Sequence, residues 1–169
     1  MGQQQLLLLV LGLVIVGLAI VTGIQAFEEN NRKARYDRFT ERAVAVAGDV
    51  IAWYQKPTAL GGMGRGIDVY NSTLSLQQIG RPQSGANGVE SWYIGSDHRV
   101  NLNRETASVM VELMEEPEAE GAILIQLRLY GVPSECWVLR RSEYRDGAWQ
   151  YNAGELAKPD GCDWSATNG

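Results

Sequence analysis

Histidine, cysteine and early proline are scarce in this sequence, which has one histidine, two cysteines and no proline before Pro57. A lone histidine, His98, and the wide spacing of the cysteines speak against a zinc site and against a catalytic triad. No GxSxG, HExxH or paired-acid motif stands in a context typical of catalysis. We therefore expect a protein that is not an enzyme and that holds no metal and no cofactor.

Basic residues are also absent from Met1–Gln5, where a cleaved secretory signal carries them. Such a signal has an apolar core of only about 7–15 residues. Here the apolar run continues from Leu6 to Ala26 without a charge or a proline, and about 20 residues are what a helix needs to cross a bilayer. We therefore predict a short leader, residues 1–5, followed by the transmembrane half of a helix at residues 6–27.

The chain also lacks an excess of positive charge: its net charge is −5, and its isoelectric point is about 4.9. An acidic chain has no broad attraction for phosphate backbones, so nucleic acid is not expected as the primary partner. With 169 residues, the chain has room for one ordinary domain and an extension.

The helix signal continues beyond the apolar run. Apolar residues spaced alternately by three and four positions form one stripe, which we expect to pack on the rest of the chain: Tyr36, Phe39, Ala43, Val46, Val50 and Trp53. No proline interrupts this amphipathic half, residues 28–56, before Pro57. The two halves together predict one unbroken helix over residues 6–54, which would be about 70 Å long.

Small residues recur within the apolar half of this helix. The small residues are Gly12, Gly17, Ala19, Gly23 and Ala26, and the predicted assembly surface also includes Leu6, the first residue of the apolar run. Small side chains let helices approach closely in an apolar setting, and Ala19 with Gly23 fits the small-xxx-small pattern. We therefore predict that these residues form an assembly surface, although glycine is also frequent in membrane helices in general.

From about residue 65, the helical period gives way to short runs of β-forming residues between turn signals. The runs are 91–94, 99–103, 108–114, 122–130, 136–144 and 148–151. Short connections at Gly95–Asp97, Pro117–Gly121 and Asp146–Gly147 favour an antiparallel meander. One face of such a sheet needs a cover, which the apolar stripe of the helix supplies. The predicted fold is therefore α+β, with a long N-terminal α-helix packed on a small antiparallel β-sheet head, residues 57–169.

Three segments of the head carry motifs that resemble sites. The glycine-rich stretch Gly61–Gly66 lacks the ending of a phosphate-binding loop, so we expect a flexible connection. Residues 67–90 have the composition of a surface loop, in which Asn71 begins a glycosylation acceptor pattern. Acidic residues gather across a predicted turn, where a solvated loop is the default and weak cation binding the alternative: Glu115, Glu116, Glu118 and Glu120.

The two cysteines, Cys136 and Cys162, lie 26 positions apart. Disulfides persist outside the cytosol, so export favours a bridge over two buried free thiols. A bridge that closes this loop contributes about 3.5 kcal/mol in the chain-entropy model. The positive-inside rule would place the head in the cytoplasm, because a group of bases follows the apolar run: Arg32, Lys33, Arg35, Arg38 and Arg42. The rule weakens for long translocated domains, and acids are interleaved with these bases, so we expect an extracytoplasmic head.

The opening MGQQQLLLLVLGLVIVGLAIVTGI and the later WYQKPTALGG resemble a group of pilin-like bacterial proteins, and the predicted architecture resembles type IV pilins and pseudopilins. The resemblance implies cleavage after Gly2, which leaves Gln3 first, and a precursor pool in the inner membrane. It further implies a structural subunit that polymerises with identical subunits into an extracellular filament, with a pilus assembly machinery as partner. A minor pseudopilin of a secretion system and a single-pass, membrane-anchored binding or adhesin domain are the alternatives.

Overall fold

The described part of the chain forms one long α-helix, two short 3-10 helices and six strands. The computed structural model describes residues 2–64, 74–82, 90–94, 98–105, 108–116, 119–151, 157–162 and 164. The chain divides into two compact units, Met1–Asp37 and Arg38–Gly169, and we call the second one the head unit.

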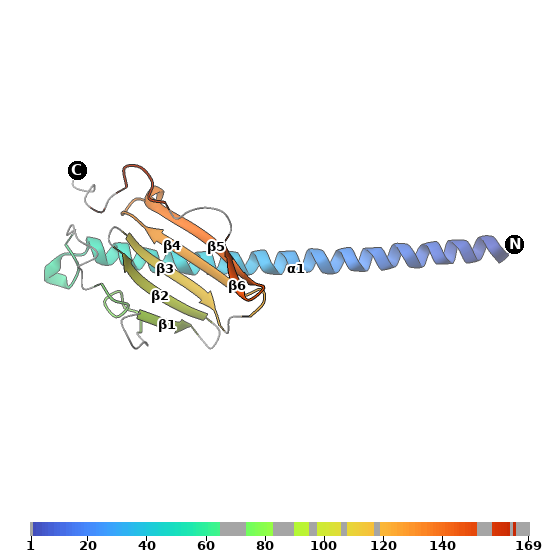
Figure 1. Cartoon of the computed structure of the whole chain (residues 1–169), viewed down its shortest axis with the longest axis horizontal. Helices are drawn as coiled ribbons and strands as arrows, with labels where there is room; N and C mark the ends of the chain where they lie inside the picture. Colours follow the sequence, from blue (N-terminus) through green and yellow to red (C-terminus); the bar gives the residue numbers. More distant parts are fainter. Residues whose placement is uncertain are drawn as a thin grey trace. The chain divides into compact units, whose positions relative to one another are not determined.

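The helix α1 runs without a break from Gly2 to Gln55 (Figure 1). An interior proline would remove a backbone hydrogen bond and clash with the preceding turn, and this segment has none. The helix ends just before Pro57. The prediction of an unbroken helix over residues 6–54 is confirmed, and the helix begins earlier than predicted because Gln3–Gln5 are good helix formers.

The head unit contains a six-stranded sheet in which the strands lie side by side in sequence order. All neighbouring strands are antiparallel, so the sheet is the predicted meander. Asp146 and Gly147, between the last two strands, have positive φ angles of 53° and 75°, as the predicted hairpin turn requires. The predicted turn at Gly95–Asp97 and part of that at Pro117–Gly121 lie outside the described residues. The strands are β1 Glu90–Ile94, β2 His98–Glu105, β3 Ser108–Glu115, β4 Ile123–Leu129, β5 Trp137–Arg145 and β6 Ala148–Tyr151.

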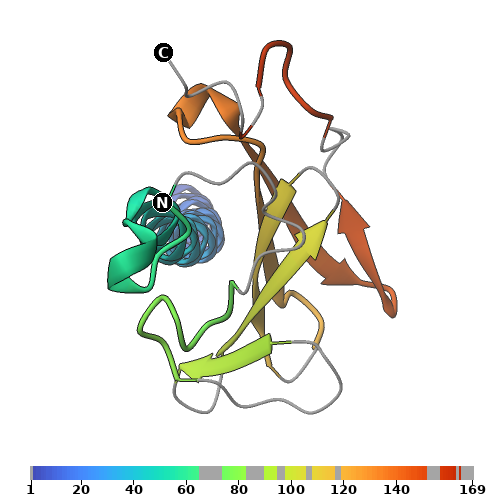
Figure 2. The same cartoon turned by 90° about the vertical axis from the view of Figure 1, so that its left-hand side faces the viewer.

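The part of α1 that belongs to the head unit, residues 38–55, covers one face of this sheet, as Figure 2 shows in a view along the helix. The members of the predicted stripe that lie in the head unit are all buried: Phe39, Ala43, Val46, Val50 and Trp53. On β2, the His98 ring lies 4.9 Å from the Phe39 ring, centroid to centroid. Each large apolar side chain buried in this way stabilises the fold by roughly 1.5–3 kcal/mol. The α+β architecture is confirmed, while Tyr36 lies in the other unit and its packing stays a prediction.

The glycine-rich segment after α1 is held by backbone hydrogen bonds as far as Gly64, so the prediction of a flexible connection is wrong for this part. The Met63 amide donates to the Trp53 carbonyl at 3.2 Å, and the Gly64 amide donates to the Lys56 carbonyl at 2.9 Å. Trp53 Nε1 donates to the Gly61 carbonyl at 3.2 Å. Gly61 and Gly64 have positive φ, so glycine is needed here to form the turn.

Gly62→Ala and Gly48→Ala should change stability in opposite directions. A Cβ on Gly62 would collide with the Lys56 carbonyl, whereas a Cβ on Gly48, on the exposed side of α1, meets nothing within 4 Å. We expect Gly62→Ala to lower the free energy of unfolding by at least about 1 kcal/mol. We expect Gly48→Ala to raise it by up to about 1 kcal/mol. Urea unfolding of the full chain in detergent, followed by circular dichroism, measures both changes. If Gly62→Ala left the free energy of unfolding unchanged, Gly62 would not pack against Lys56 as described.

Residues 74–82 are partly buried, whereas their composition predicts a surface loop. Leu74 and Leu76 are only 1% and 0% exposed. Arg81 Nε donates to the Asp49 carboxylate of α1 at 3.0 Å, and its guanidinium lies 4.8 Å from the centroid of the Trp92 ring. Arg81 therefore ties this loop to the helix and to the edge strand β1. Asn71, the predicted glycosylation position, lies outside the described residues.

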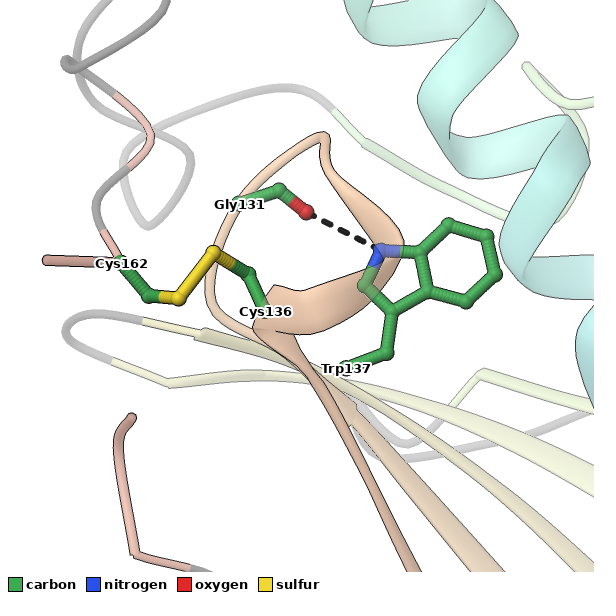
Figure 3. The surroundings of a disulfide bond; sticks show 4 residues. All are labelled: Gly131, Cys136, Trp137 and Cys162. Atoms are coloured by element: carbon green, nitrogen blue, oxygen red, sulfur yellow. Dashed lines mark hydrogen bonds between the residues drawn. A yellow bond between two sulfur atoms is a disulfide. The ribbon is translucent and has the colours of Figure 1, made fainter. Parts of the chain in front are cut away.

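The predicted disulfide joins Cys136 and Cys162. Figure 3 shows it beside the turn that precedes β5, where Trp137 Nε1 donates to the Gly131 carbonyl at 3.2 Å. Both cysteines are buried in a small cluster with Tyr130. The bridge therefore attaches the C-terminal segment to the start of β5.

Shortly after the bridge, the C-terminal segment meets the end of α1 in an aromatic contact. The ring centroids of Tyr54 and Trp164 lie 4.9 Å apart, and the Tyr54 hydroxyl donates to the Trp164 carbonyl at 2.7 Å. Trp164 is buried, 3% exposed. The contact joins residues 110 positions apart, so no local pattern predicts it.

Candidate functional site on the long helix

The apolar half of α1 has no cover within its own unit. The large apolar side chains from Leu6 to Phe27 are between 49% and 68% exposed. The most apolar window of α1 has a mean hydropathy of 2.9, and none of it is buried. Length and composition therefore allow α1 to cross a membrane, although a signal sequence passes the same test. Exposed apolar surface on this scale marks contact with lipid or with other protein.

Four of the predicted assembly residues lie on one side of α1. A helix turns by about 100° per residue, so positions about 7, 11 and 14 residues after Gly12 return to nearly the same direction. These positions hold Ala19, Gly23 and Ala26. We call the four residues the small-residue face.

Leu6 and Gly17 lie on a different side of the helix. Gly17 is rotated from Gly23 by roughly 120°, and Leu6 points in nearly the same direction as Gly17. The six residues predicted as one assembly surface therefore divide between two sides of α1. The prediction rested on small residue size and, for Leu6, on the start of the apolar run, and the helical period divides these residues between two sides.

Glycine at positions 12, 17 and 23 is not required by the fold of a single chain. A Cβ built on Gly12, Gly17 or Gly23 meets nothing within 4 Å. Glycine inside a helix is less stable than alanine by about 1 kcal/mol in water. Small side chains such as those of the small-residue face are what close packing of helices in an apolar setting requires.

Beyond Phe27 the surface of α1 becomes charged. Lys33 Nζ lies 2.8 Å from Glu29 Oε1, one helical turn away. The hydrogen bond from Lys33, together with its charge, holds the pKa of Glu29 below its ordinary value. Both side chains are more than half exposed, so the pair adds little to stability. This part of the helix is suited to water.

Within the head unit, the exposed side of α1 carries a second run of small residues, which the sequence analysis did not single out. Ala45, Gly48 and Ala52 are exposed, and Val44 next to them is 43% exposed. Gly48 and Ala52 have the same small-xxx-small spacing as Ala19 and Gly23. This spacing of four positions could have identified Gly48 and Ala52 from the sequence.

The acidic cluster is divided among separate contacts. Glu116 pairs with an arginine of β2 at 2.8 Å, and Glu115 accepts from the first amide of β4 at 3.0 Å. Glu120 accepts from an amide in the turn between β5 and β6 at 3.2 Å, and Glu118 lies outside the described residues. Across the described ranges, no three His, Cys, Asp or Glu side chains are grouped in a way that could hold a metal ion. Weak cation binding therefore gains no support.

Gly2 and Gln3, the predicted processing position, form the first turn of α1. Cleavage between them stays a prediction. Comparison with known proteins adds no family, since no family model, no curated protein and no solved structure matches the chain. The most distinctive feature of the described chain is the apolar half of α1, which has no cover within its own unit.

Proposed function

We propose that this chain is the structural subunit of a type IV pilus-like filament, and that it polymerises by packing identical α1 helices side by side. One observation carries the proposal: the apolar half of α1 has no cover within its own unit, and among the described residues a Cβ on Gly12, Gly17 or Gly23 meets nothing within 4 Å. Helices in lipid gain no hydrophobic energy by associating, so small residues that permit close packing favour their association. In a filament the small-residue face would contact sister helices in place of lipid.

The disulfide supports an extracytoplasmic position for the head unit. Disulfides persist in oxidising compartments, and Cys136–Cys162 is buried within the head unit. The apolar half of α1 would then lie in the inner membrane until an assembly machinery moves the subunit into the filament. A head-to-tail contact that does not close by rotation yields an open helical polymer.

Electron microscopy of material sheared from cells that express the chain tests this proposal. We expect thin filaments with this chain as their main protein. Mass spectrometry of the same material should find Gln3 as the first residue. A chain that stays monomeric in the membrane fraction would contradict the proposal and would favour an anchored binding domain.

A further inference from the structure

The face of the sheet that turns away from α1 carries a polar and aromatic group of residues on β4, β5 and β6. Side chains alternate along a strand, so Gln126 of β4 faces away from its fully buried neighbour Ile125. Gln126 lies opposite Arg140 of β5, and Ser142 of β5 lies opposite Tyr151 of β6. We call Gln126, Arg140, Ser142 and Tyr151 the outer cluster.

Within the described part of the chain, three polar atoms of the outer cluster are buried without a hydrogen-bond partner: Gln126 Oε1, Arg140 Nε and Ser142 Oγ. Gln126 is 9% exposed, and Ser142 is 0% exposed. Gln126 Nε2 donates to Glu112 Oε1 at 2.8 Å, which leaves the amide oxygen as the unused end of the side chain. Buried polar atoms almost always have hydrogen-bond partners. Three such atoms on adjacent positions therefore indicate that a ligand or an ordered water forms hydrogen bonds with them.

Aromatic side chains border these atoms. The guanidinium carbon of Arg140 lies 3.9 Å from the centroid of the Tyr151 ring, and Tyr151 is 47% exposed. In the same hairpin, the Tyr144 and Trp149 rings meet edge to face at 5.3 Å. No carboxylate among the described residues pairs with Arg140, so its side chain can leave the Tyr151 ring without breaking an ion pair.

The mixture of donors and acceptors decides which ligand fits. Gln126 Oε1 only accepts, Arg140 Nε only donates, and Ser142 Oγ does both. A phosphate or a carboxylate would satisfy the arginine but would bring negative charge to the amide oxygen. A hydroxyl group both donates and accepts. Adjacent hydroxyls of a sugar can therefore meet all three atoms while the C–H face of its ring lies on an aromatic side chain.

We propose that the outer cluster binds a saccharide. The sugar ring replaces the Arg140 guanidinium on Tyr151, and its hydroxyls donate to Gln126 Oε1 and accept from Arg140 Nε. The site lies wholly within the head unit, so it does not depend on the proposed filament. In the proposed filament, the site would be present in many copies, which raises avidity.

Sugar binding by the full chain, in a zwitterionic detergent without a sugar headgroup, tests the proposal. The probes are D-glucose, D-galactose, D-mannose, N-acetyl-D-glucosamine, lactose and cellobiose, with inorganic phosphate as the anionic comparison. Saturation-transfer NMR and tryptophan fluorescence report binding. We expect saturable binding of at least one sugar and no binding of phosphate. Binding of phosphate alone, or of no probe, would overturn the proposal.

Variants of the outer cluster make the test specific. Gln126→Leu and Tyr151→Leu should each weaken the binding at least about fivefold, the first by removing an acceptor and the second by removing the ring. Tyr151 is nearly half exposed, so Tyr151→Leu stays folded even if Gln126→Leu does not. Arg145→Ala, on the other face of β5 with a side chain 49% exposed, is the control and should bind normally. Unchanged affinity in Tyr151→Leu, or a crystal structure in which only ordered water fills the cluster, would refute sugar binding.

Discussion

Gly23→Leu should reduce filament formation at least about tenfold while the head unit stays folded. Gly23 belongs to the small-residue face, and a leucine there would hold neighbouring helices apart along the whole apolar half of α1. A loss of about 1.4 kcal/mol per subunit contact already reduces association tenfold, and a polymer repeats that loss at every subunit. Sedimentation of sheared material and counting of filaments by electron microscopy measure the effect. We expect at least about a tenfold loss.

Gly17→Leu is the matched control. It introduces the same side chain into the same apolar half, but on the side of α1 away from the small-residue face, and a Cβ there also meets nothing within 4 Å. We expect this variant to form filaments, and we expect both variants to form the Cys136–Cys162 bridge. Normal filaments from Gly23→Leu would rule out close packing at this face. If both variants lost filaments equally, a larger side chain anywhere in the apolar half, or a defect in membrane insertion, would be the cause, and the small-residue face would have no special role.

Cys136→Ser should lower the free energy of unfolding by about 3.5 kcal/mol, because the bridge closes a loop between residues 26 positions apart. Small domains are stable by only about 5–15 kcal/mol in total, so this would be a large fraction. The loss should be accompanied by a change in tryptophan emission, since the bridge holds Trp164 on Tyr54. Urea unfolding of the full chain in detergent, followed by fluorescence, measures both.

Ser134→Ala is the control for the cysteine variant, because Ser134 is exposed and lies with Cys136 in the short 3-10 helix η2, Ser134–Cys136. We expect it to change stability by less than about 0.5 kcal/mol. If Cys136→Ser were as stable as this control, the bridge would not be what holds the C-terminal segment in place.

The parts of the fold that follow from local patterns were predictable. The absence of proline predicts an unbroken α1, and the stripe from Phe39 to Trp53 predicts the side of α1 that is buried. The Asp-Gly pair at 146–147 predicts the turn between β5 and β6. These features depend on neighbours a few residues apart, so the sequence contains the information directly.

The parts that depend on distant residues were not predictable in the same way. Leu74 and Leu76 stand between polar and glycine-rich stretches, and only the packed structure shows that they are in the core. The composition of residues 61–64 indicates flexibility, but composition does not reveal that their amides donate to the end of α1. On α1 itself, the sequence shows which residues are small, but only the helical period shows that Gly17 and Gly23 lie on different sides of the helix.

The contact between Tyr54 and Trp164 bears on when a newly made chain completes its fold. Strands β1 to β6 pair in the order in which they are synthesised, so the sheet can form strand by strand while the chain is still being made. The last turn of α1, however, gains its aromatic partner only after 110 further residues have arrived. A chain that is still incomplete would therefore have the end of α1 without its aromatic partner, and the contact between Tyr54 and Trp164 marks a chain whose fold is finished.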